Sequence, residues 1–382
     1  MKFGFTHVSL ENWRNFRSVD LPLRERMFIV GPNAAGKTNL LDAFRFLGDI
    51  AKPKGSLAGA VESRGGFGRI RSLHAHGTDR HLKIVVELLI TKTKWRYELT
   101  LSGVGKKPAL VENERVLKND VELLNRPNAD DKTDPRLREQ THLEQLTQNA
   151  RFRDLADALA SVAHVHVVPQ VAKGFLRSDE ATLRDAPGSD FIERIAMLPD
   201  KKQRGALNRI GKLLQAAVPQ FSHLKITHEK KTGRPHLEAS YKHWRAHGTW
   251  QNEQEFSDGT LRLIGLFWAI LDGDSPLLLE EPELSLHEAV VKQVPRILAR
   301  AGSMSERQII VSTHSEKVLN DLGVDPSEIV LLMPTDGDTE AKLASTDEVV
   351  VRGAKANLPL GSLVSGRTKP SGIAQLSLSF RE

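Results

Sequence analysis

The residues with the clearest chemistry form one short segment near the start of the chain. It reads Gly31-Pro-Asn-Ala-Ala-Gly36-Lys37-Thr38 and fits the pattern G-x-x-x-x-G-K-[ST]. In such a loop the main-chain N–H groups point at phosphate oxygens, the lysine bridges the β and γ phosphates, and the hydroxyl binds Mg2+. The pattern predicts a nucleotide site, with a simple glycine turn as the alternative. The expected ATP-binding residues are Gly31, Pro32, Asn33, Ala34, Ala35, Gly36, Lys37, Thr38 and Asn39.

A second segment places two carboxylates side by side. Glu280 and Glu281 follow the apolar run 276–279, and ligands of parallel sheets bind at the carboxyl ends of the strands. Adjacent acids repel each other, but a magnesium ion offsets that repulsion. We expect Glu280 to hold the ion through water and Glu281 to orient or deprotonate the attacking water. An ordinary acidic loop is the alternative.

Two further segments are ambiguous alone and gain meaning from their order along the chain. Ser257, Asp258 and Gly259 precede an apolar helix, so they predict either a second phosphate-binding helix start or a plain serine N-cap. His314 follows the apolar run 309–311 and the polar residues Ser-Thr. It is a candidate sensor of the γ-phosphate, with a structural histidine as the alternative.

These residues need strands and helices that carry them to one edge of a sheet. The run 27–30 predicts a buried strand, and the apolar positions of 39–47 lie on one face of a helix. Later in the chain we expect helices over 259–271 and 286–300 and strands over 276–279, 308–311 and 329–333. Because strands and helices alternate there, the fold class is α/β with a mixed, mainly parallel sheet flanked by helices.

The rest of the chain predicts added layers. Alternation over 3–10 and a hairpin over 83–101 indicate N-terminal antiparallel strands, whereas 105–160 is charged and reads as helical. A strand over 164–168, helices over 190–218 and two strands around a Lys-Thr-Gly-Arg turn complete a helical and β insertion lobe. We expect four segments, the last loosely ordered: 1–104, 105–250, 251–352 and 353–382.

Composition excludes several classes of protein. The chain of 382 residues has no cysteine, which excludes disulfides, thiol catalysis and cysteine-held metals and suits a cytoplasmic protein. The N-terminus lacks the apolar run of a signal peptide, and no stretch approaches the apolar length of a membrane span. The net charge of +6 permits contact with nucleic acid without requiring it.

Taken in order, these motifs resemble the ABC ATPase superfamily of P-loop NTPases. The detail is similar to the branch that contains RecF, SMC and OLD-type ATPases. The segments that carry this resemblance are LENWRNFR from Leu10, GKTNLLDA from Gly36, EEPELSLH from Glu280 and STHS from Ser312. They cover about 1–50 and 250–335, while the middle resembles the family only loosely. No sustained heptads predict coiled-coil arms, and Asp336-Gly-Asp338 reads as a turn rather than part of a Toprim nuclease.

The resemblance implies a composite site. In this superfamily the signature, here Ser257, Asp258 and Gly259, caps the ATP held by a second protomer, so a homodimer encloses two ATP molecules with Mg2+. The resemblance also suggests Gln170 as the Q-loop ligand of magnesium beside Thr38 and Glu280, with a surface-loop glutamine as the alternative. Two departures put the hydrolysis rate in doubt. The signature is Ser-Asp-Gly-Thr rather than Ser-Gly-Gly-Gln, and Glu280 replaces the usual aspartate.

The role of such a switch is open between two hypotheses. As the resemblance implies, a compact ATPase of this kind is similar to components of bacterial antiphage defence that hold a protein effector. The alternative is RecF-like DNA maintenance through a basic middle lobe, unless that lobe is only a solvated charged face. Its residues are Lys201, Lys202, Arg204, Lys230, Lys231, Arg234, Lys242 and Arg245, with Tyr241 and Trp244 nearby. His74, His76, His164 and His166 have no acid at a fixed offset, so we assign no further metal site.

Overall fold

The computed structural model describes residues 2–72, 81–103, 108–174, 190–242 and 249–369. These residues divide into two compact units. Unit 1 contains Met1–Ala163, Asp274–Leu278 and Pro295–Glu382, and unit 2 contains His164–Gly273 and Leu279–Val294. The four segments expected from the motifs follow chain order and stay a prediction. His74, His76, Trp244 and Arg245 lie outside the described residues.

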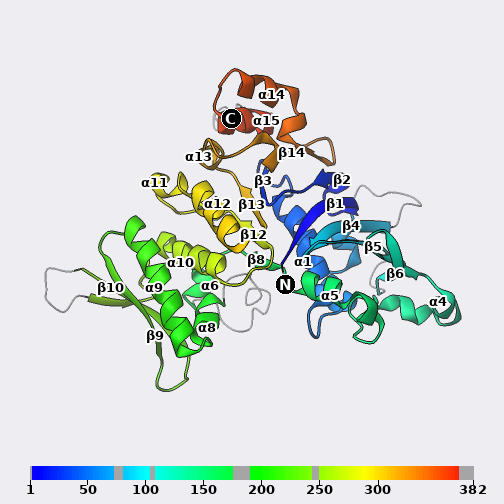
Figure 1. Cartoon of the computed structure of the whole chain (residues 1–382), viewed down its shortest axis with the longest axis horizontal. Coiled ribbons are helices and arrows are strands. Elements are labelled where there is room, and N and C mark those ends of the chain that lie inside the picture. Colours follow the sequence, from blue (N-terminus) through cyan, green and yellow to red (C-terminus); the bar gives the residue numbers. More distant parts are fainter. Residues whose placement is uncertain (1, 73–80, 104–107, 175–189, 243–248, 370–382) are drawn as a thin grey trace, which may run out of the picture. The chain divides into compact units, whose positions relative to one another are not determined.

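An antiparallel sheet opens unit 1 and follows directly from the alternating sequence (Figure 1). Its strand order is β2-β1-β4-β5-β6-β7. Along β1 the apolar side chains Phe3, Phe5, Val8 and Leu10 are buried, and Val8 pairs with Val86 of β4. The strand bounds are β1 Phe3–Trp13, β2 Phe16–Pro22, β4 His81–Ile90, β5 Thr93–Ser102, β6 Leu110–Lys118 and β7 Val121–Arg126.

The helical prediction for 105–160 is wrong over much of its length, because this part supplies β6 and β7. In β6 a buried carboxylate interrupts the apolar alternation: Glu114 is fully buried between Val111 and Val116 and pairs with Arg126 at 3.1 Å. Within 129–160 the structure has only short helices, of which α5 was expected. Their bounds are α4 Ala129–Thr133, η1 Pro135–Glu139, η2 Gln148–Phe152 and α5 Arg153–Ala160.

A second sheet has the order β15-β14-β3-β13-β12-β8. The pairs β3–β13 and β3–β14 are parallel, as expected, and β15 is antiparallel to β14. The boundary between the two units falls within β12, after Leu278, and within β8, after Ala163. The strand bounds are β3 Arg26–Val30, β8 Ala163–Val165, β12 Leu277–Glu280, β13 Ile309–Thr313, β14 Ile329–Pro334 and β15 Thr339–Leu343.

The helices of unit 1 include one that the composition did not predict. The segment after 353 was expected to be loosely ordered, yet 360–368 forms α15, which packs against α13 and α14. The turn predicted at Asp336-Gly-Asp338 is confirmed, and it joins β14 to β15. The bounds are α1 Lys37–Ala51, α2 Leu57–Glu62, α3 Phe67–Ile70, α12 Val294–Ser305, α13 Glu316–Leu319, η3 Pro326–Glu328, η4 Ala344–Thr346, α14 Glu348–Lys355 and α15 Leu360–Thr368.

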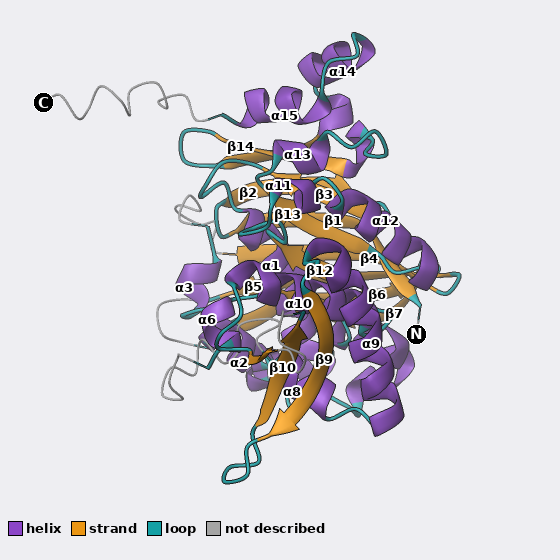
Figure 2. Ribbon diagram, turned by 90° about the vertical axis from the view of Figure 1, so that its left-hand side faces the viewer, coloured by secondary structure: helices purple, strands orange, loops and turns teal. Residues whose placement is uncertain are grey.

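Unit 2 combines helices with a small antiparallel sheet of order β11-β10-β9, in which the predicted hairpin is confirmed (Figure 2). Leu237 and Ala239 of β10 are buried and pair with Ile226 and Leu224 of β9. The bounds are α6 Pro169–Ala172, α8 Phe191–Ala196, α9 Asp200–Ala217, β9 Phe221–His228, β10 Pro235–Tyr241, β11 Thr249–Asn252, α10 Asp258–Leu271 and α11 Glu288–Val291.

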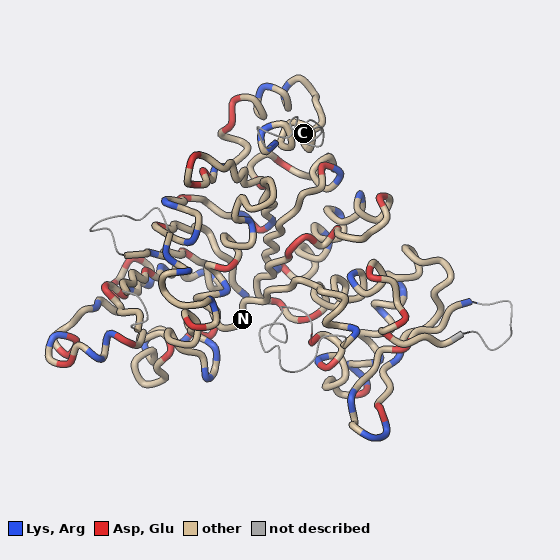
Figure 3. Tube along the Cα trace, turned by 180° about the vertical axis from the view of Figure 1, so that it is seen from behind, with Lys and Arg blue, Asp and Glu red and all other residues tan. Residues whose placement is uncertain are grey.

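Charge is distributed along the chain without one dominant sign. Figure 3 shows Lys and Arg interspersed with Asp and Glu along the trace. Across the described ranges, no helix combines the length and the apolar character that crossing a membrane would need.

Candidate nucleotide site

The loop between β3 and α1 has the backbone geometry that its glycines predict. Gly36 has φ = 92° and Ala34 has φ = 64°, both in the left-handed region. A Cβ atom on Gly36 would lie within 2.3 Å of the Asn15 side chain, and one on Gly31 would lie 2.9 Å from Leu332. Glycine is therefore required at both ends of the loop. Gly36 also gives the start of α1 no side-chain cap, which suits a phosphate as partner for the first N–H groups.

Lys37 and His314, which are 277 residues apart in sequence, lie together in unit 1. The Lys37 side chain is buried, and its Nζ donates to the carbonyl oxygens of Gly31 and Pro32, both at 3.1 Å. The same Nζ lies 3.5 Å from Nδ1 of His314, at the end of β13. Because β13 is parallel to β3, the carboxyl ends of both strands reach the loop. The predicted lysine and histidine are thus neighbours.

Asn15, to which the sequence patterns assign no role, holds the phosphate loop through hydrogen bonds. Asn15 donates from Nδ2 to the carbonyl of Ala35 at 3.0 Å and to Thr339 Oγ1 at 2.9 Å. Its Oδ1 accepts from Asn39 Nδ2 at 2.7 Å. Asn15 belongs to the LENWRNFR segment, so the signal for it was visible as a resemblance, but no spacing rule connects it to the loop. It is a positioning residue.

The helix that follows the loop is anchored by a cluster of ion pairs. Asp42 of α1 contacts Arg14 Nη2 at 2.6 Å and Arg64 Nη2 at 2.8 Å. Burial alone would raise the pKa of Asp42, but the two guanidinium groups outweigh it and hold that pKa below its usual value of 3.8. Asp42 is therefore a carboxylate at neutral pH and ties α1 to two other segments.

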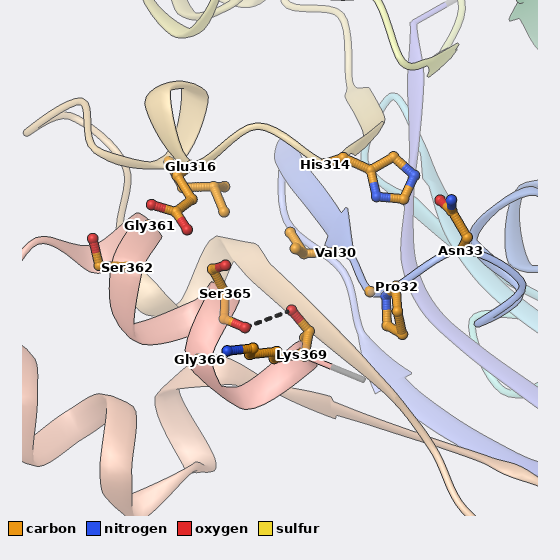
Figure 4. Close-up of a pocket in the computed structure, with 13 residues that line it drawn as sticks. Val30, Pro32, Asn33, His314, Glu316, Gly361, Ser362, Ser365, Gly366 and Lys369 are labelled. Carbon is orange, nitrogen blue, oxygen red and sulfur yellow. Dashed lines mark hydrogen bonds between the residues drawn. The ribbon is translucent and has the colours of Figure 1, made fainter. Parts of the chain in front are cut away.

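A cavity of about 910 Å3 adjoins the loop (Figure 4). On one side it is lined by Pro32, Asn33 and His314, and on the other by residues of α15 and its end, including Ser365 and Lys369. The α15 helix is fixed to α13, because the Gly361 N–H donates to Asn320 Oδ1 at 2.7 Å, just beyond that helix. No motif in the sequence indicates that α15 lines this cavity.

In unit 2 the acid pair stands at the end of β12. Glu280 Oε1 lies 2.7 Å from Nε2 of His164 in β8, and the two residues are 116 positions apart. The acid partner that sequence spacing did not reveal for His164 is therefore Glu280. Glu281 has φ = 43°, a left-handed conformation that is strained for a residue with a side chain. Strain of this kind concentrates at functional sites.

The segment Ser257–Gly259 forms the start of α10. Ser257 Oγ accepts from the Thr260 N–H at 3.1 Å, so it is an N-cap, as its alternative interpretation required. A Cβ on Gly259 would lie 2.6 Å from the carbonyl oxygen of Ser285, so only glycine fits. The capping role and a phosphate-binding role use the same geometry, and the signature assignment stays a prediction.

Two charged groups accompany this helix start. Lys173 Nζ contacts Asp258 Oδ1 at 2.8 Å. On the next turn of α10, burial lowers the pKa of Arg262, although Asp258, Glu281 and Glu283 act in the opposite direction. The carboxylate at the start of α10 is thus balanced by cations from its own unit.

Gln170 lies in the short helix α6 and is exposed. Its role as a magnesium ligand stays a prediction, as does that of Thr38. Over the described ranges no cluster of three His, Cys, Asp or Glu side chains forms a metal site. The expected donors, a hydroxyl, an amide oxygen and a carboxylate, are all oxygen atoms, which fits magnesium.

A family model described as "AAA domain, putative AbiEii toxin, Type IV TA system" matches residues 26–320, well over half of the chain. The chain belongs to this AAA-domain family. The match begins at β3 and ends just beyond α13, so it includes the phosphate loop, the start of α10, the acid pair and His314.

Two relatives with different functions match short parts of this AAA-domain protein in sequence. It is 44% identical over 50 residues to the DNA replication and repair protein RecF of Roseiflexus castenholzii, which is 13% of each chain. It is 34% identical over 85 residues to the endonuclease GajA of Bacillus cereus, covering 22% of this chain and 13% of GajA. The chain therefore matches only about an eighth of the length of either relative.

Solved structures extend the likeness to nearly the whole chain. An SMC head bound to the C-winged helix domain of ScpA has a TM-score of 0.53 at 13% identity, covering 88% of this chain and 96% of that one. An SMC head with a coiled coil and joint from Pyrococcus yayanosii has a TM-score of 0.52 at 11% identity, covering 92% and 100%. The fold is that of an SMC-head-like P-loop ATPase. In fold and in these short sequence matches, the AAA-domain protein is similar to ABC-type ATPases of the RecF, SMC and OLD branch.

Proposed function

We propose that the protein binds ATP with magnesium and hydrolyses it. The observation that carries this proposal is the meeting of Lys37 with the carbonyls of its loop and with His314 in unit 1. A lysine in this position can bind the β and γ phosphates, and the histidine can donate a hydrogen bond to charge that develops on the γ-phosphate. His314 directly follows β13, and Lys37 begins α1 after the loop that follows β3; β3 and β13 are parallel neighbours.

The acids of β12 supply the rest of the chemistry in this proposal. Magnesium, when bound, neutralises charge on the phosphates and polarises the bond that breaks. Thr38, Glu280 and Gln170 offer oxygen ligands, and Glu281 accepts a proton from the attacking water. The strained backbone at Glu281 supports this role, because a costly conformation persists where the surroundings select it.

We infer further that the working unit is a homodimer with ATP shared between two copies. The start of α10, with Ser257, Asp258 and Gly259, would face the nucleotide held by the phosphate loop of the partner. A ligand bound by both copies stabilises the closed dimer, and its hydrolysis removes that stabilisation. ATP would thus operate a switch between closed and open forms.

The process that this switch controls is proposed to be antiphage defence, with a protein effector as the partner of the ATPase. Support comes from the local likeness to the endonuclease GajA and from the toxin system in the description of the family. The protein would act in the cytoplasm, which its lack of cysteine suits. The effector would dock on the middle lobe or on the C-terminal region.

DNA maintenance is the second candidate, supported by the local likeness to RecF. Seven of the eight basic residues of the expected lobe are described, and all seven are exposed: Lys201, Lys202, Arg204, Lys230, Lys231, Arg234 and Lys242. Along the trace of the chain, Lys and Arg in general are interspersed with Asp and Glu (Figure 3). If they bind phosphates, affinity for DNA must fall steeply as salt rises. An affinity for DNA that does not fall as the salt concentration rises would contradict this function.

The substitution Glu281→Gln tests the proposed reaction. It keeps the size of the side chain but replaces the carboxylate with a neutral amide that cannot act as a base, so we expect ATP binding to persist and hydrolysis to fall about 10²- to 10⁴-fold. Dimer should accumulate, as measured by light scattering during gel filtration with ATP and magnesium. Glu288→Gln, at an exposed glutamate of α11, is the matched control and should behave as the unchanged protein.

Two outcomes would contradict the proposal. Undiminished hydrolysis by Glu281→Gln would remove Glu281 from the reaction. A monodisperse monomer at saturating ATP and magnesium would remove the shared dimer site.

A further inference from the structure

One histidine and one carboxylate form a buried pair in unit 2. Nε2 of His164 lies 2.7 Å from Oε1 of Glu280, and their side chains are only 9% and 10% exposed. His166, two residues later, reaches the main-chain oxygen of Glu280 instead, at 3.4 Å. His164 therefore contacts the carboxylate of Glu280, whereas His166 contacts only its backbone.

The direction of the hydrogen bond follows from the chemistry of the two groups. A carboxylate that binds magnesium is ionised and only accepts hydrogen bonds, so in the proposed site Nε2 of His164 is the donor. Among the described residues, Nδ1 of His164 is buried without a hydrogen-bond partner. A proton on that nitrogen would be an unsatisfied buried donor, which is costly. The surroundings therefore favour the tautomer that donates to Glu280.

The local environment makes this bond strong. Val165, Val167 and Leu279 line a small cavity beside Glu280, together with Arg262. Both members of the pair are about nine-tenths buried, and at the lower dielectric of a protein interior a hydrogen bond to a charged group gains strength.

We propose that His164 positions the carboxylate of Glu280 for magnesium. The inference rests on the proposed function, in which Glu280 helps to hold the ion. Magnesium demands near-ideal octahedral geometry, so a ligand that points in several directions binds it poorly. Partners that orient a metal ligand typically account for about 10- to 100-fold in metal affinity. His164 is a positioning residue, because it acts through Glu280.

The pairing also accounts for a departure in the sequence. Glu280 stands where the wider superfamily has aspartate, and glutamate has one more rotatable bond between backbone and carboxylate. Each extra rotamer must be frozen when the ligand binds, at a cost in conformational entropy. A hydrogen bond from His164 freezes the carboxylate in advance and offsets that cost. The longer acid and the histidine therefore function as a pair.

The test measures metal binding separately from turnover. Binding of the fluorescent nucleotide mant-ATP is titrated with Mg2+, and binding of Mn2+ to the protein–nucleotide complex is followed by electron paramagnetic resonance. We expect His164→Ala to raise the half-saturating metal concentration about 10- to 100-fold. Nucleotide binding without metal should stay unchanged, whereas the unfolding midpoint should fall, because the buried carboxylate of Glu280 loses its hydrogen bond to His164. His164→Gln, whose Nε2 can donate from the same place, should restore metal binding to within a few-fold.

His166→Ala is the matched control, because His166 lies just beyond β8 and the substitution spares the carboxylate contact. A double-mutant cycle with Glu280→Asp gives a second, independent measurement. The shorter acid cannot reach the imidazole, so His164→Ala should cost nothing further in that background. This comparison holds even if His164→Ala is less stable.

The outcomes separate the inference from the function on which it rests. Normal metal affinity in His164→Ala would overturn the positioning role alone. So would a loss of metal affinity in His164→Gln and His166→Ala as large as the loss in His164→Ala. If the unchanged protein bound mant-ATP with no dependence on metal, the proposed function itself would fail.

Discussion

Single residues outside the motif decide how rigidly the phosphate loop is held. Asn15 bridges the loop to the start of α1 and to Thr339 in β15. Asp42, one turn further along α1, binds two guanidinium groups. These contacts fix the loop before any ligand arrives, and a site that is already ordered loses less entropy on binding.

Asp42→Asn should therefore weaken the protein in a manner that depends on pH. Removing one partner of a buried ion pair costs about 3 kcal/mol at neutral pH. The folded pKa of Asp42 is below 3.8, so its stabilisation is present above about pH 3.8 and is lost as pH falls further. We expect the difference in unfolding free energy between the two proteins to shrink on acidification, as measured by urea unfolding.

Asp49→Asn is the control for this prediction, since Asp49 is on the same helix and also contacts Arg64, at 2.9 Å, but is more exposed. It should cost less at neutral pH. If the loss of unfolding free energy in Asp42→Asn stayed constant with pH, the charge of Asp42 would not stabilise the fold.

The residues predicted from sequence are those whose chemistry is local. Lys37 and Thr38 are fixed by a contiguous motif, and their loop has the expected form. The pair His164–Glu280 could not be predicted, because 116 residues separate its members and only the sheet brings them together. The ion pair Glu114–Arg126 lies within the segment that was predicted to be helical, and the sequence alone gives no sign that these charged residues are buried partners.

Among the helices and strands, α15 is the one that lines the cavity beside the phosphate loop without having been predicted. It is short and rich in glycine and serine, so its propensity for helix is weak and its sequence predicted a loose tail. Packing on α13 and α14 overrides that propensity. By contrast, α1 and β3 were predictable because periodicity and burial agree in them.

Gly361→Val should detach α15 from α13. A Cβ on Gly361 would lie 2.2 Å from the carbonyl oxygen of Glu316, so even the first carbon of a larger side chain forces the two helices apart. Overpacking of this kind costs about 1–3 kcal/mol. We expect a lower melting temperature, faster hydrogen exchange over 360–368 and altered affinity for mant-ATP, since α15 lines the cavity beside the loop.

Gly366→Ala is the matched control, because a Cβ there meets nothing within 4 Å. Within the same helix it should be neutral or stabilise the fold by up to about 1 kcal/mol. If Gly361→Val left hydrogen exchange over 360–368 unchanged, α15 would not depend on its contact with α13.

At the scale of the whole molecule, the motifs are divided between two compact units. Unit 1 holds Lys37 and His314, and unit 2 holds Ser257, Glu280 and Glu281. Motif order along the chain was enough to predict the class of ATPase, because that order reflects the alternation of strands and helices. It does not distinguish a signature that serves its own chain from one that serves a partner.

Substitution of Ser257 separates its structural role from a role between copies. Ser257→Asp keeps a good N-cap for α10 but adds a negative charge, so stability should hold while a phosphate facing this helix start is repelled. Ser257→Ala loses the cap, at about 1 kcal/mol, without adding charge. If capping is the whole role of Ser257, the alanine variant is the impaired one and the aspartate variant hydrolyses ATP normally.

Mixing two inactive variants then tests whether the site is assembled from two chains. Lys37→Ala lacks the phosphate-binding lysine but keeps its signature, and Ser257→Asp has the reverse defect. In an equal mixture, half of the dimers carry one intact composite site, so we expect up to about a quarter of the normal hydrolysis rate if the sites act independently. The measurement is phosphate release against the mixing ratio, which should peak near equal amounts. A mixture no more active than its two components would contradict a site shared between copies and would assign each ATP to a single chain.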